Sequence, residues 1–366
     1  MSTAHEEQPL TPARWAGQGR PRRTPVLAAL SALLAVIVLA ACGSSEPGSG
    51  GTGSGASTAA ATGFPTAVPA GTKLRVGDQG GTLKAPLDLS GQTTGEPYAV
   101  DWSTFASGPL LLEAFRANAV DVGYVADTPP VIAAASGQDL AVIASWQNPA
   151  GQLMLATKPG SDIRTVSDLK GKKVAFSVGT ILQAYLLRSL DKAGLAQKDV
   201  KTVNLLPTDI AGALSRGDAD AAVLVEPLAS PYLKDNPTAH KVDGADASPS
   251  VQYLITTHKA LSDPAKQAAL GDFVARWVKA SAWRDSHIDE FTQKYYVEQL
   301  KVPAETGKLL LAKTSPSAFV PIDATSTGGA QKLADLFTSS GVIPKKVDIS
   351  KVFDARYNSA VQEAQQ

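Results

Sequence analysis

Three short turns in the sequence place backbone N–H groups and small polar side chains where a ligand could bind. The most informative is Ala126-Asp127-Thr128-Pro129-Pro130, where an apolar strand gives way directly to a helix. The first N–H groups of a helix have no partner within it, so a helix that begins at the carboxyl end of a strand offers an anion site. Either Asp127 or Thr128 could be the N-cap, with proline in the first helical turn. This arrangement predicts anion capture, with plain capping and no ligand as the alternative.

The other two turns have the same character. Asp78-Gln79-Gly80-Gly81 follows the first predicted strand, and its glycines allow backbone N–H groups to approach a ligand closely. A simple tight turn explains this segment equally well. Ser177-Val178-Gly179-Thr180 leads from a strand into a helix in the other half of the chain. Two helix N-termini facing one cleft would hold an anion with few or no cationic side chains.

Catalytic and metal chemistry find little support among the reactive residues. The four histidines are His5, His240, His258 and His287, and their spacing is not that of metal ligands. No Gly-x-Ser-x-Gly nucleophile elbow is present. The glycine-rich stretch 48–55 is not followed by Gly-Lys-Ser/Thr, so it is not a phosphate-binding loop. We therefore expect no catalytic residue, no metal and no cofactor.

Aromatic residues could line a pocket for the rest of the ligand. Trp146 is the best candidate because it lies at the end of a predicted strand. Core packing is nevertheless the more typical role of Trp102, Tyr124 and Trp146 alike, since aromatic side chains usually bury for area. Trp277 and Trp283 share a helical stripe with Phe273, which predicts core positions.

The N-terminus has the layout of an export signal. Arginines at 20, 22 and 23 precede the apolar run 25–41, and Leu39-Ala40-Ala41-Cys42 closes it with small residues. These four residues resemble the lipobox of bacterial lipoproteins, which implies a signal peptide over 1–41 and acylation of Cys42. An ordinary signal peptide with a chance cysteine is one alternative. A membrane anchor is another, although the run is short for a span. The export route, Sec or twin-arginine, stays open.

Composition separates a tether from a folded region. Residues 42–72 are rich in Gly, Ser, Thr, Ala and Pro, which predicts a flexible linker. The full chain has 34 basic and 34 acidic residues, and the first 42 hold four basic and two acidic ones. The remaining 30 and 32 give a net charge near −2, with no basic footprint for nucleic acid. We expect a monomer without a nucleic-acid partner.

The elements that must position these turns alternate between strand and helix, which indicates an α/β fold with mostly parallel sheets. Strands are predicted at 73–76, 98–102, 119–125, 140–145, 153–157, 174–176, 203–206, 221–225 and 252–256, and helices at 109–117, 128–135, 167–171, 180–193, 210–215, 264–286, 290–300, 328–339 and the C-terminus. A repeat supports two similar halves. A helix, a turn and an apolar strand lead to Asp127, and the same pattern leads to Glu226, 99 residues later, with a proline following each.

These segments together resemble the solute-binding proteins of bacterial ABC importers for aliphatic sulfonates, taurine and nitrate, and the aliphatic-sulfonate branch most closely. The resemblance covers about 73–287. It rests on Leu74-Arg-Val-Gly-Asp-Gln-Gly-Gly81, Trp102-Ser-Thr-Phe-Ala-Ser-Gly-Pro109, Val120-Asp-Val-Gly-Tyr-Val-Ala-Asp-Thr-Pro-Pro130, Val166-Ser-Asp-Leu-Lys-Gly-Lys-Lys-Val174, Val178-Gly-Thr180, Asp218-Ala-Asp-Ala-Ala-Val223 and Glu226-Pro227.

The resemblance implies a two-lobed type II periplasmic-binding-protein fold. Lobe 1 would comprise 73–157 and 252–366, lobe 2 would comprise 158–251, and the hinge would lie near 157–159 and 249–251. The ligand, most simply an organosulfonate, would lie between the lobes and contact Gln79, Gly80, Gly81, Asp127, Thr128, Gly179, Thr180, Trp146 and Glu226. The partners would be an importer permease and, through lipid on Cys42, the outer face of the cell membrane.

Two departures from the family pattern leave the ligand open. Ile181 stands where family members often have a second serine or threonine, and Glu226-Pro227 stands where aromatic residues often follow the strand. Glu226 would repel a purely anionic ligand, or pair with a ligand amino group, or merely cap lobe 2. Taurine, nitrate or another nitrogen or sulfur compound are therefore alternative ligands, and an enzyme on the same fold acting on a small carboxylate or heterocycle is the alternative class.

Overall fold

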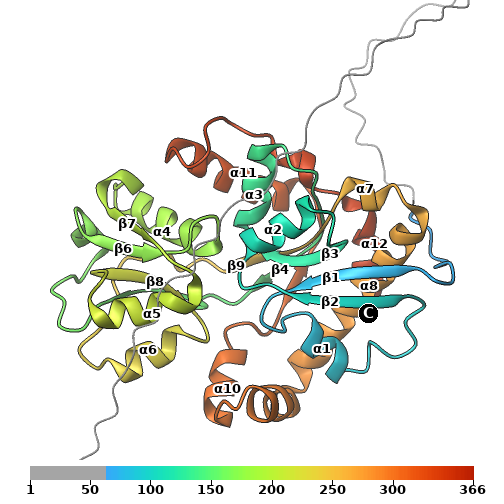
Figure 1. Cartoon of the computed structure of the whole chain (residues 1–366), viewed down its shortest axis with the longest axis horizontal. Coiled ribbons are helices and arrows are strands. Elements are labelled where there is room, and N and C mark those ends of the chain that lie inside the picture. Colours follow the sequence, from blue (N-terminus) through green and yellow to red (C-terminus); the bar gives the residue numbers. More distant parts are fainter. Residues whose placement is uncertain (1–62) are drawn as a thin grey trace, which may run out of the picture. The chain divides into compact units, whose positions relative to one another are not determined.

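The computed structural model describes residues 63–366, so the predicted signal peptide, Cys42 and most of the predicted linker lie outside the described residues. The first of two sheets has six strands in the order β10-β4-β9-β3-β1-β2 (Figure 1). The strands are β1 (Lys73–Asp78), β2 (Ala99–Thr104), β3 (Val122–Ala126), β4 (Ala141–Asn148), β9 (Ser250–Thr256) and β10 (Ala318–Val320).

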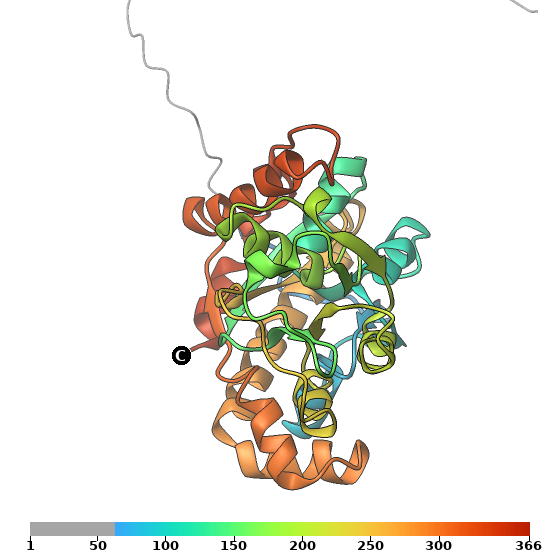
Figure 2. The same cartoon turned by 90° about the vertical axis from the view of Figure 1, so that its left-hand side faces the viewer.

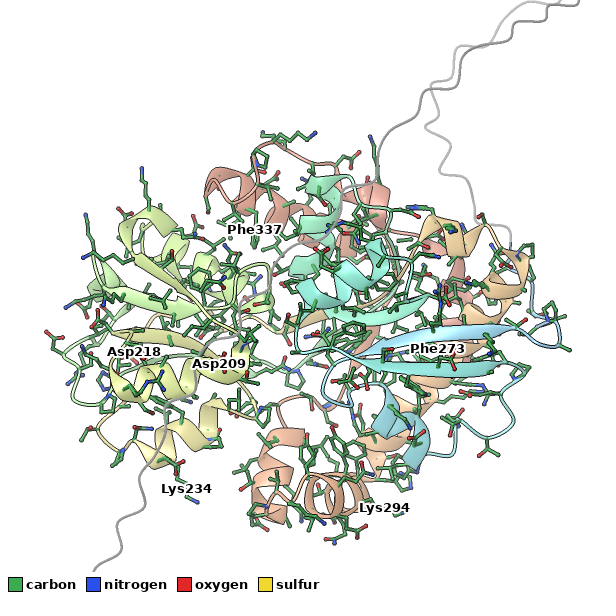
Figure 3. The ribbon with its side chains drawn as sticks, in the orientation of Figure 1. Asp209, Asp218, Lys234, Phe273, Lys294 and Phe337 are labelled. Carbon is green, nitrogen blue, oxygen red and sulfur yellow. The ribbon has the colours of Figure 1, made fainter. Side chains whose placement is uncertain are left out.

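Helices cover both faces of this sheet because its strands alternate apolar side chains between them. Leu254 and Ile255 of β9 are both fully buried, and they belong to two different hydrophobic clusters. The cluster with Leu254 packs against α1 (Lys84–Leu89), α7 (His258–Leu261), α8 (Pro264–Ser286) and α12 (Asn358–Ala364). The cluster with Ile255 packs against α2 (Gly108–Arg116) and α3 (Thr128–Ser136). Figure 3 shows the labelled Phe273 of α8 at the six-stranded sheet, whereas Lys294 lies at the periphery.

The second sheet has four strands in the order β5-β8-β6-β7 and its own hydrophobic core. Its elements are β5 (Leu153–Thr157), β6 (Lys173–Phe176), β7 (Lys201–Asn204) and β8 (Ala221–Val225), with α4 (Ile181–Lys192), α5 (Pro207–Arg216) and α6 (Ala229–Asp235) around them and the 3₁₀-helices η1 (Val166–Leu169) and η2 (Gln197–Asp199) in its loops. Strands β5 to β8 therefore repeat the arrangement of β9-β3-β1-β2, with one antiparallel and two parallel pairings in each set. This agreement is what the repeated helix–turn–strand motif indicates.

The remaining helices extend the first sheet in two directions. On one side lie α9 (Ile288–Phe291), the π-helix η3 (Thr292–Gln299) and α10 (Ala304–Leu311). On the other side lies α11 (Ala324–Ser339), followed by η4 (Ile349–Val352) and η5 (Ala355–Tyr357). Figures 1 and 2 show α10 and α11 on opposite sides of the region between the two sheets. Val131 of α3, Leu187 of α4 and Phe337 of α11 share one cluster, so apolar contact joins the two sheet regions.

The structure corrects three expectations. Strand β5, placed in lobe 1 from the sequence, pairs antiparallel with β8, so the chain leaves the six-stranded sheet after Asn148 and not near residue 157. The six-stranded sheet is mixed and not mostly parallel, because β9 and β10 run antiparallel to their neighbours. Helices α1, α6, α7 and α10 and strand β10 were not predicted. Pro86 in α1 and Pro231 in α6 explain two of these omissions, since an internal proline argues against a helix.

Candidate functional site

A cavity of about 400 Å³ lies between the two sheets and draws its wall from both. The six-stranded side contributes residues 79–82, Ser107, Gly108, Tyr124, Trp146 and Asn148; the four-stranded side contributes residues 180–182, Thr208 and 225–227; the later helices contribute Trp277, Arg284, Phe291, Tyr295 and Tyr296. These positions include the carboxyl ends of β1, β3, β4 and β8, where open α/β sheets bind ligands.

The loop after β1 is held open by a buried carboxylate. Asp78 accepts the N–H groups of Gln79, Leu83 and Lys84 at 2.7, 3.0 and 3.2 Å. Burial raises the pKa of Asp78, although these N–H donors oppose the shift. Gly81 has φ +74°, and a Cβ there would lie 2.4 Å from the Tyr295 hydroxyl, so glycine is required. The N–H groups of residues 80 and 81 donate to no other described residue, which leaves them available to a ligand.

The starts of α2 and α4 meet across the cavity. A Cβ on Gly179, just before α4, would lie 3.3 Å from Cγ of Pro109 in α2. Ser107, the N-cap of α2, makes no side-chain capping hydrogen bond, and Gly108 contributes an N–H group to the cavity wall. Residues at the starts of α2 and α4 therefore line the same cavity, an arrangement that favours an anion.

At the start of α4, Thr180 is already engaged within its own turn. Its hydroxyl donates to the carbonyl of Ser177 at 2.7 Å and accepts the N–H of Leu182 at 3.2 Å. Thr180 lines the cavity but is only 6% exposed. Gly179 does not line it, and its N–H donates to Oε1 of Gln183 at 2.9 Å.

At the third predicted helix start, that of α3, Pro129 lines this cavity but Asp127 and Thr128 do not. Thr128 has no exposed surface, and its hydroxyl donates to Oδ1 of Asp127 at 2.9 Å. The reason is that α2 covers the first turn of α3: a Cβ on Gly108 would lie 2.6 Å from Cγ of Pro129. The start of α2 therefore takes the place in the cavity wall that was expected for Thr128.

Asp127 points to the opposite end of α4. Its Oδ2 accepts from Nη1 of Arg188 at 3.0 Å, and Nε of the same arginine donates to Asp246 at 2.7 Å. Lys192 also pairs with Asp246 at 2.7 Å. Asp127 and Arg188 line a second cavity of about 630 Å³ beside α11. This cavity is larger than the first, and the Asp127–Arg188 pair in its wall joins the two sheet regions.

Aromatic side chains form the wall next to the six-stranded sheet and the later helices. Trp146 stacks on Tyr124 with ring centroids 5.7 Å apart and meets the edge of Trp277 at 5.5 Å. Trp146, predicted to contact the ligand, lies in the wall with 1% exposure. Trp277, predicted as core only, is both core and wall. Trp102 contacts Phe273 and Lys84 instead.

Two charged residues stand in the wall. Glu226 accepts from the backbone N–H of Ser230 at 3.1 Å and from the hydroxyl of the same serine. Arg284, which is 5% exposed, donates to Asp285, Thr314 and Ser317. Glu226 was predicted from its place after β8, and the structure brings it into the cavity. Arg284 was not predicted, because it lies within the 23-residue helix α8 and no local motif distinguishes it.

Other wall residues also escaped prediction, although one had a signal. Ser107-Gly108-Pro109 begins α2 in the way that Asp127-Thr128-Pro129 begins α3, with an N-cap residue ahead of a proline. Asn148 and Gln152 flank the connection from β4 to β5, which becomes recognisable as a crossing only when β5 is assigned to the second sheet. Within residues 63–366, no group of three potential metal ligands comes together, and no helix is long and apolar enough to cross a membrane.

Two lobes with a ligand cavity between them define the class of the periplasmic binding proteins, and comparisons with known proteins agree. The family model described as NMT1/THI5 like matches residues 108–244. An aliphatic sulfonates-binding protein of Escherichia coli K12 is 30% identical over 280 residues, which span 75% of this chain and 86% of that relative. A protein of the same description from Bacillus subtilis 168 is 28% identical over 262 residues, with 71% and 77% covered.

Solved structures give the same answer. The alkanesulfonate-binding protein of Xanthomonas axonopodis pv. citri bound to MOPS superposes with a TM-score of 0.69 at 25% identity, covering 78% of this chain and 99% of the other. The periplasmic aliphatic sulphonate binding protein of Escherichia coli gives 0.65 at 28% identity, with 76% and 96% covered. The chain belongs to the aliphatic sulfonate-binding family and has its two-lobed type II fold.

Proposed function

We propose that this protein is the extracytoplasmic solute-binding component of an ABC importer and captures an organosulfonate between its lobes for delivery to the permease. The observation that carries the proposal is the meeting of two helix N-termini and a glycine loop at one cavity, in a chain of the sulfonate-binding family. A sulfonate has three oxygens that carry one charge, and unpaired N–H groups on helix N-termini match that chemistry.

The head group is held by the N–H groups of Gly80, Gly81 and Gly108 and by the start of α4, with Gln79 and Thr180 beside them. The tail extends over Trp146 toward the later helices. Glu226 faces this tail from the other lobe, and its hydrogen bonds to Ser230 fix its position. Asp127, Thr128 and Gly179 do not contact the ligand in this proposal, since none of them is in the cavity wall.

Each lobe is built on one sheet. Lobe 1 comprises residues 63–148 and 250–366, and lobe 2 lies between them, so the hinge segments are about 149–152 and 244–249. A ligand that contacts both lobes stabilises the closed state over the open one. Saturating sulfonate should therefore reduce the radius of gyration measured by small-angle X-ray scattering, and an unchanged radius would argue against hinged capture.

A lipid on Cys42 would anchor this monomeric domain to the outer face of the membrane through the linker. Cys42→Ser should leave the domain folded and release it into the soluble fraction, because the acyl chain provides the attachment. Retention of the variant in washed membranes would contradict lipid anchoring without affecting the assignment of the ligand.

Binding is tested on the processed protein carrying Cys42→Ser, by native mass spectrometry and calorimetry against alkanesulfonates, arylsulfonates, taurine and nitrate. We expect a one-to-one complex with sulfonates and recovery of the ligand unchanged. Tighter binding of taurine or nitrate would reassign the ligand within the family. Conversion of a ligand would replace the transport function by catalysis.

Two matched threonines test the position of the head group. Thr180→Val should weaken sulfonate binding about tenfold, because the hydroxyl that shapes the start of α4 is lost. Thr128→Val removes a hydroxyl that contacts Asp127 and should lower stability without changing the Kd. If Thr128→Val alone weakens binding, the head group lies at α3 and not at α2 and α4.

A further inference from the structure

The segment 291–300 forms part of the cavity wall and also contacts the loop after β1. Most of it is the π-helix η3 (Thr292–Gln299), and π-helical turns are frequent at functional sites. Four of its residues line the cavity: Phe291, Tyr295, Tyr296 and Leu300. Phe291 lies four and five residues before the two tyrosines, and Leu300 lies five and four residues after them. This spacing fits a helix whose hydrogen bonds span five residues and not four.

The π-helical register determines which side chains face the cavity. In an α-helix, the residues three, four and seven positions after Phe291 would share its face. Two of them, Lys294 and Glu298, are charged and exposed in the structure. Turning that face to the cavity would take both charges out of water, which is costly for unpaired ions. The wider turn brings Tyr296 and Leu300 into the wall instead, so this side of the cavity is uncharged.

Tyr295 is the residue of this segment that holds the loop after β1. It is 9% exposed, and its hydroxyl donates to the carbonyl of Gly80. Burial raises the pKa of Tyr295, so the hydroxyl keeps the proton that this hydrogen bond uses. A Cβ on Gly81 would clash with the same hydroxyl. The tyrosine therefore contacts both glycines of the loop.

The other hydrogen bonds of this loop, residues 79–84, leave two N–H groups over. Asp78 accepts three of the loop's N–H groups, and the carbonyl of Gln79 accepts that of Thr82. The N–H groups of Gly80 and Gly81 donate to no described residue. A trans peptide group is planar, so its C=O and N–H point in opposite directions. The Gly80 carbonyl and the Gly81 N–H belong to one peptide group, and a bond that holds the carbonyl also fixes the direction of the N–H.

We propose that Tyr295 is a positioning residue for ligand binding: its hydroxyl holds the peptide group between Gly80 and Gly81 in the orientation that presents the Gly81 N–H to the ligand head group. Holding a donor in its bound orientation lowers the ordering cost of binding. This function resides in the hydroxyl and not in the ring, so a substitution can separate the two. The assignment rests on the proposed function and adds a residue that acts on the ligand through the loop.

Tyr295→Phe removes the hydroxyl and keeps the ring. Calorimetry on the processed protein with Cys42→Ser should show binding about tenfold weaker for methanesulfonate, butanesulfonate and benzenesulfonate alike, because the three share a head group. An unchanged Kd, or a loss confined to the ligands with larger tails, would overturn the inference while leaving sulfonate binding intact. If the protein without this substitution binds none of the three, the proposed function itself fails.

Tyr357→Phe is the matched control. Tyr357 is fully buried in the same lobe, its hydroxyl donates to the carbonyl of Gln267 at 2.9 Å, and it does not line the cavity. Both variants should lose stability in urea melts without ligand, but only Tyr295→Phe should change the Kd measured on folded protein. If Tyr357→Phe weakens binding as much, lost stability explains the effect and Tyr295 has no positioning role.

Combining Tyr295→Phe with Gly81→Ala tests whether the tyrosine acts through the loop. A Cβ at position 81 meets the hydroxyl first, whereas the nearest ring carbons lie 3.1 and 3.3 Å away. Without the hydroxyl the clash is largely relieved, so Gly81→Ala should weaken binding about threefold in the Tyr295→Phe background, against about thirtyfold alone. Two losses that simply multiply would show that Tyr295 and the loop act independently, which would contradict the inference.

Discussion

Asp127 and Glu226 occupy equivalent positions in the two lobes, yet they do different work. Asp127 follows β3, which pairs in parallel with β1, and Glu226 follows β8, which pairs in parallel with β6. Asp127 turns away from the ligand cavity and binds Arg188 of the opposite lobe. Glu226 stays in the cavity wall and binds only its own lobe through Ser230.

The same strand arrangement, repeated in two lobes, therefore produces two different regions: the cavity at Glu226 and the contact between lobes at Asp127. Helix α4 takes part in both, since its first turn lines the ligand cavity and its Arg188 lies about two turns further along. Charged pairs are concentrated around Arg188, which binds Asp246 as well as Asp127. The proposed ligand site relies on backbone N–H groups instead. We infer that charge pairing determines how the lobes contact each other, and that the dipoles of the helix N-termini determine which ligand they bind.

Arg188→Met should have the largest effect of the substitutions considered, and it should act on stability. Asp127 is 7% exposed and would keep only the hydroxyl of Thr128 as a partner. Removing one member of a buried ion pair leaves an uncompensated charge, and we expect a loss of about 3 kcal/mol in the free energy of unfolding. Urea denaturation measures this loss. Sulfonate affinity at low temperature, where the variant is folded, should change much less, and a large loss of affinity with normal stability would contradict the division of roles.

Gly81→Ala should weaken ligand binding, because Gly81 lies in the loop after β1 that lines the cavity. Its Cβ would meet the Tyr295 hydroxyl, which donates to the carbonyl of Gly80, so the loop and the tyrosine must separate. With the cost of φ +74° for a non-glycine residue, we expect sulfonate binding to weaken about thirtyfold, or about 2 kcal/mol. Gly80→Ala is the control, because it has a similar φ of +60° but meets nothing within 4 Å. Equal losses in both variants would attribute the effect to backbone strain alone.

Much of this comparison could be predicted from the sequence, because it depends on local chemistry. Periodicity and turn residues gave the strands that carry the site, and the repeat around Asp127 and Glu226 indicated two similar lobes. The orientation of these two carboxylates could not be predicted, since the partner of Asp127 is 61 residues away on a helix of the other lobe. In the same way, Ser107 and Gly108 line the cavity and Thr128 does not, because α2 packs over Pro129.

The later helices show the other limit of sequence reasoning. The period of α8 predicts a buried stripe, and the structure confirms that Phe273 and Trp277 are buried. Periodicity reports burial but not what lies on the far side of the buried face. Whether Trp277 meets core or cavity depends on where α9, η3 and α10 fold, and those elements carry no motif that fixes their docking.

Asp121 forms charge pairs within one lobe, whereas Asp127 pairs with a residue of the other lobe. Burial alone would raise the pKa of Asp121, but hydrogen bonds from Arg75 and Lys266 hold it at about 2. The pKa of this carboxyl is lower in the folded state than the ordinary value of 3.8, so its contribution is present above pH 4 and is lost as the pH falls toward 2. The contribution is about 2 kcal/mol. Asp121→Asn should flatten the stability of the protein between pH 4 and 2 in urea melts, and an unchanged slope would show that other carboxylates dominate.

The smallest effect is expected at Glu226, and it sharpens the comparison with Asp127. Glu226→Gln keeps an oxygen that can accept from Ser230, so we expect stability to change by less than about 1 kcal/mol. The substitution removes a negative charge from a cavity that we assign to an anion, and screened repulsion across such a site amounts to about 1 kcal/mol. Sulfonate binding should therefore tighten by about threefold to fivefold, and more at low ionic strength than at high. Calorimetry at two salt concentrations measures both effects. If binding weakens instead, Glu226 contacts a cationic group on the ligand, and the two carboxylates after β3 and β8 would both be pairing residues, one with the protein and one with the ligand.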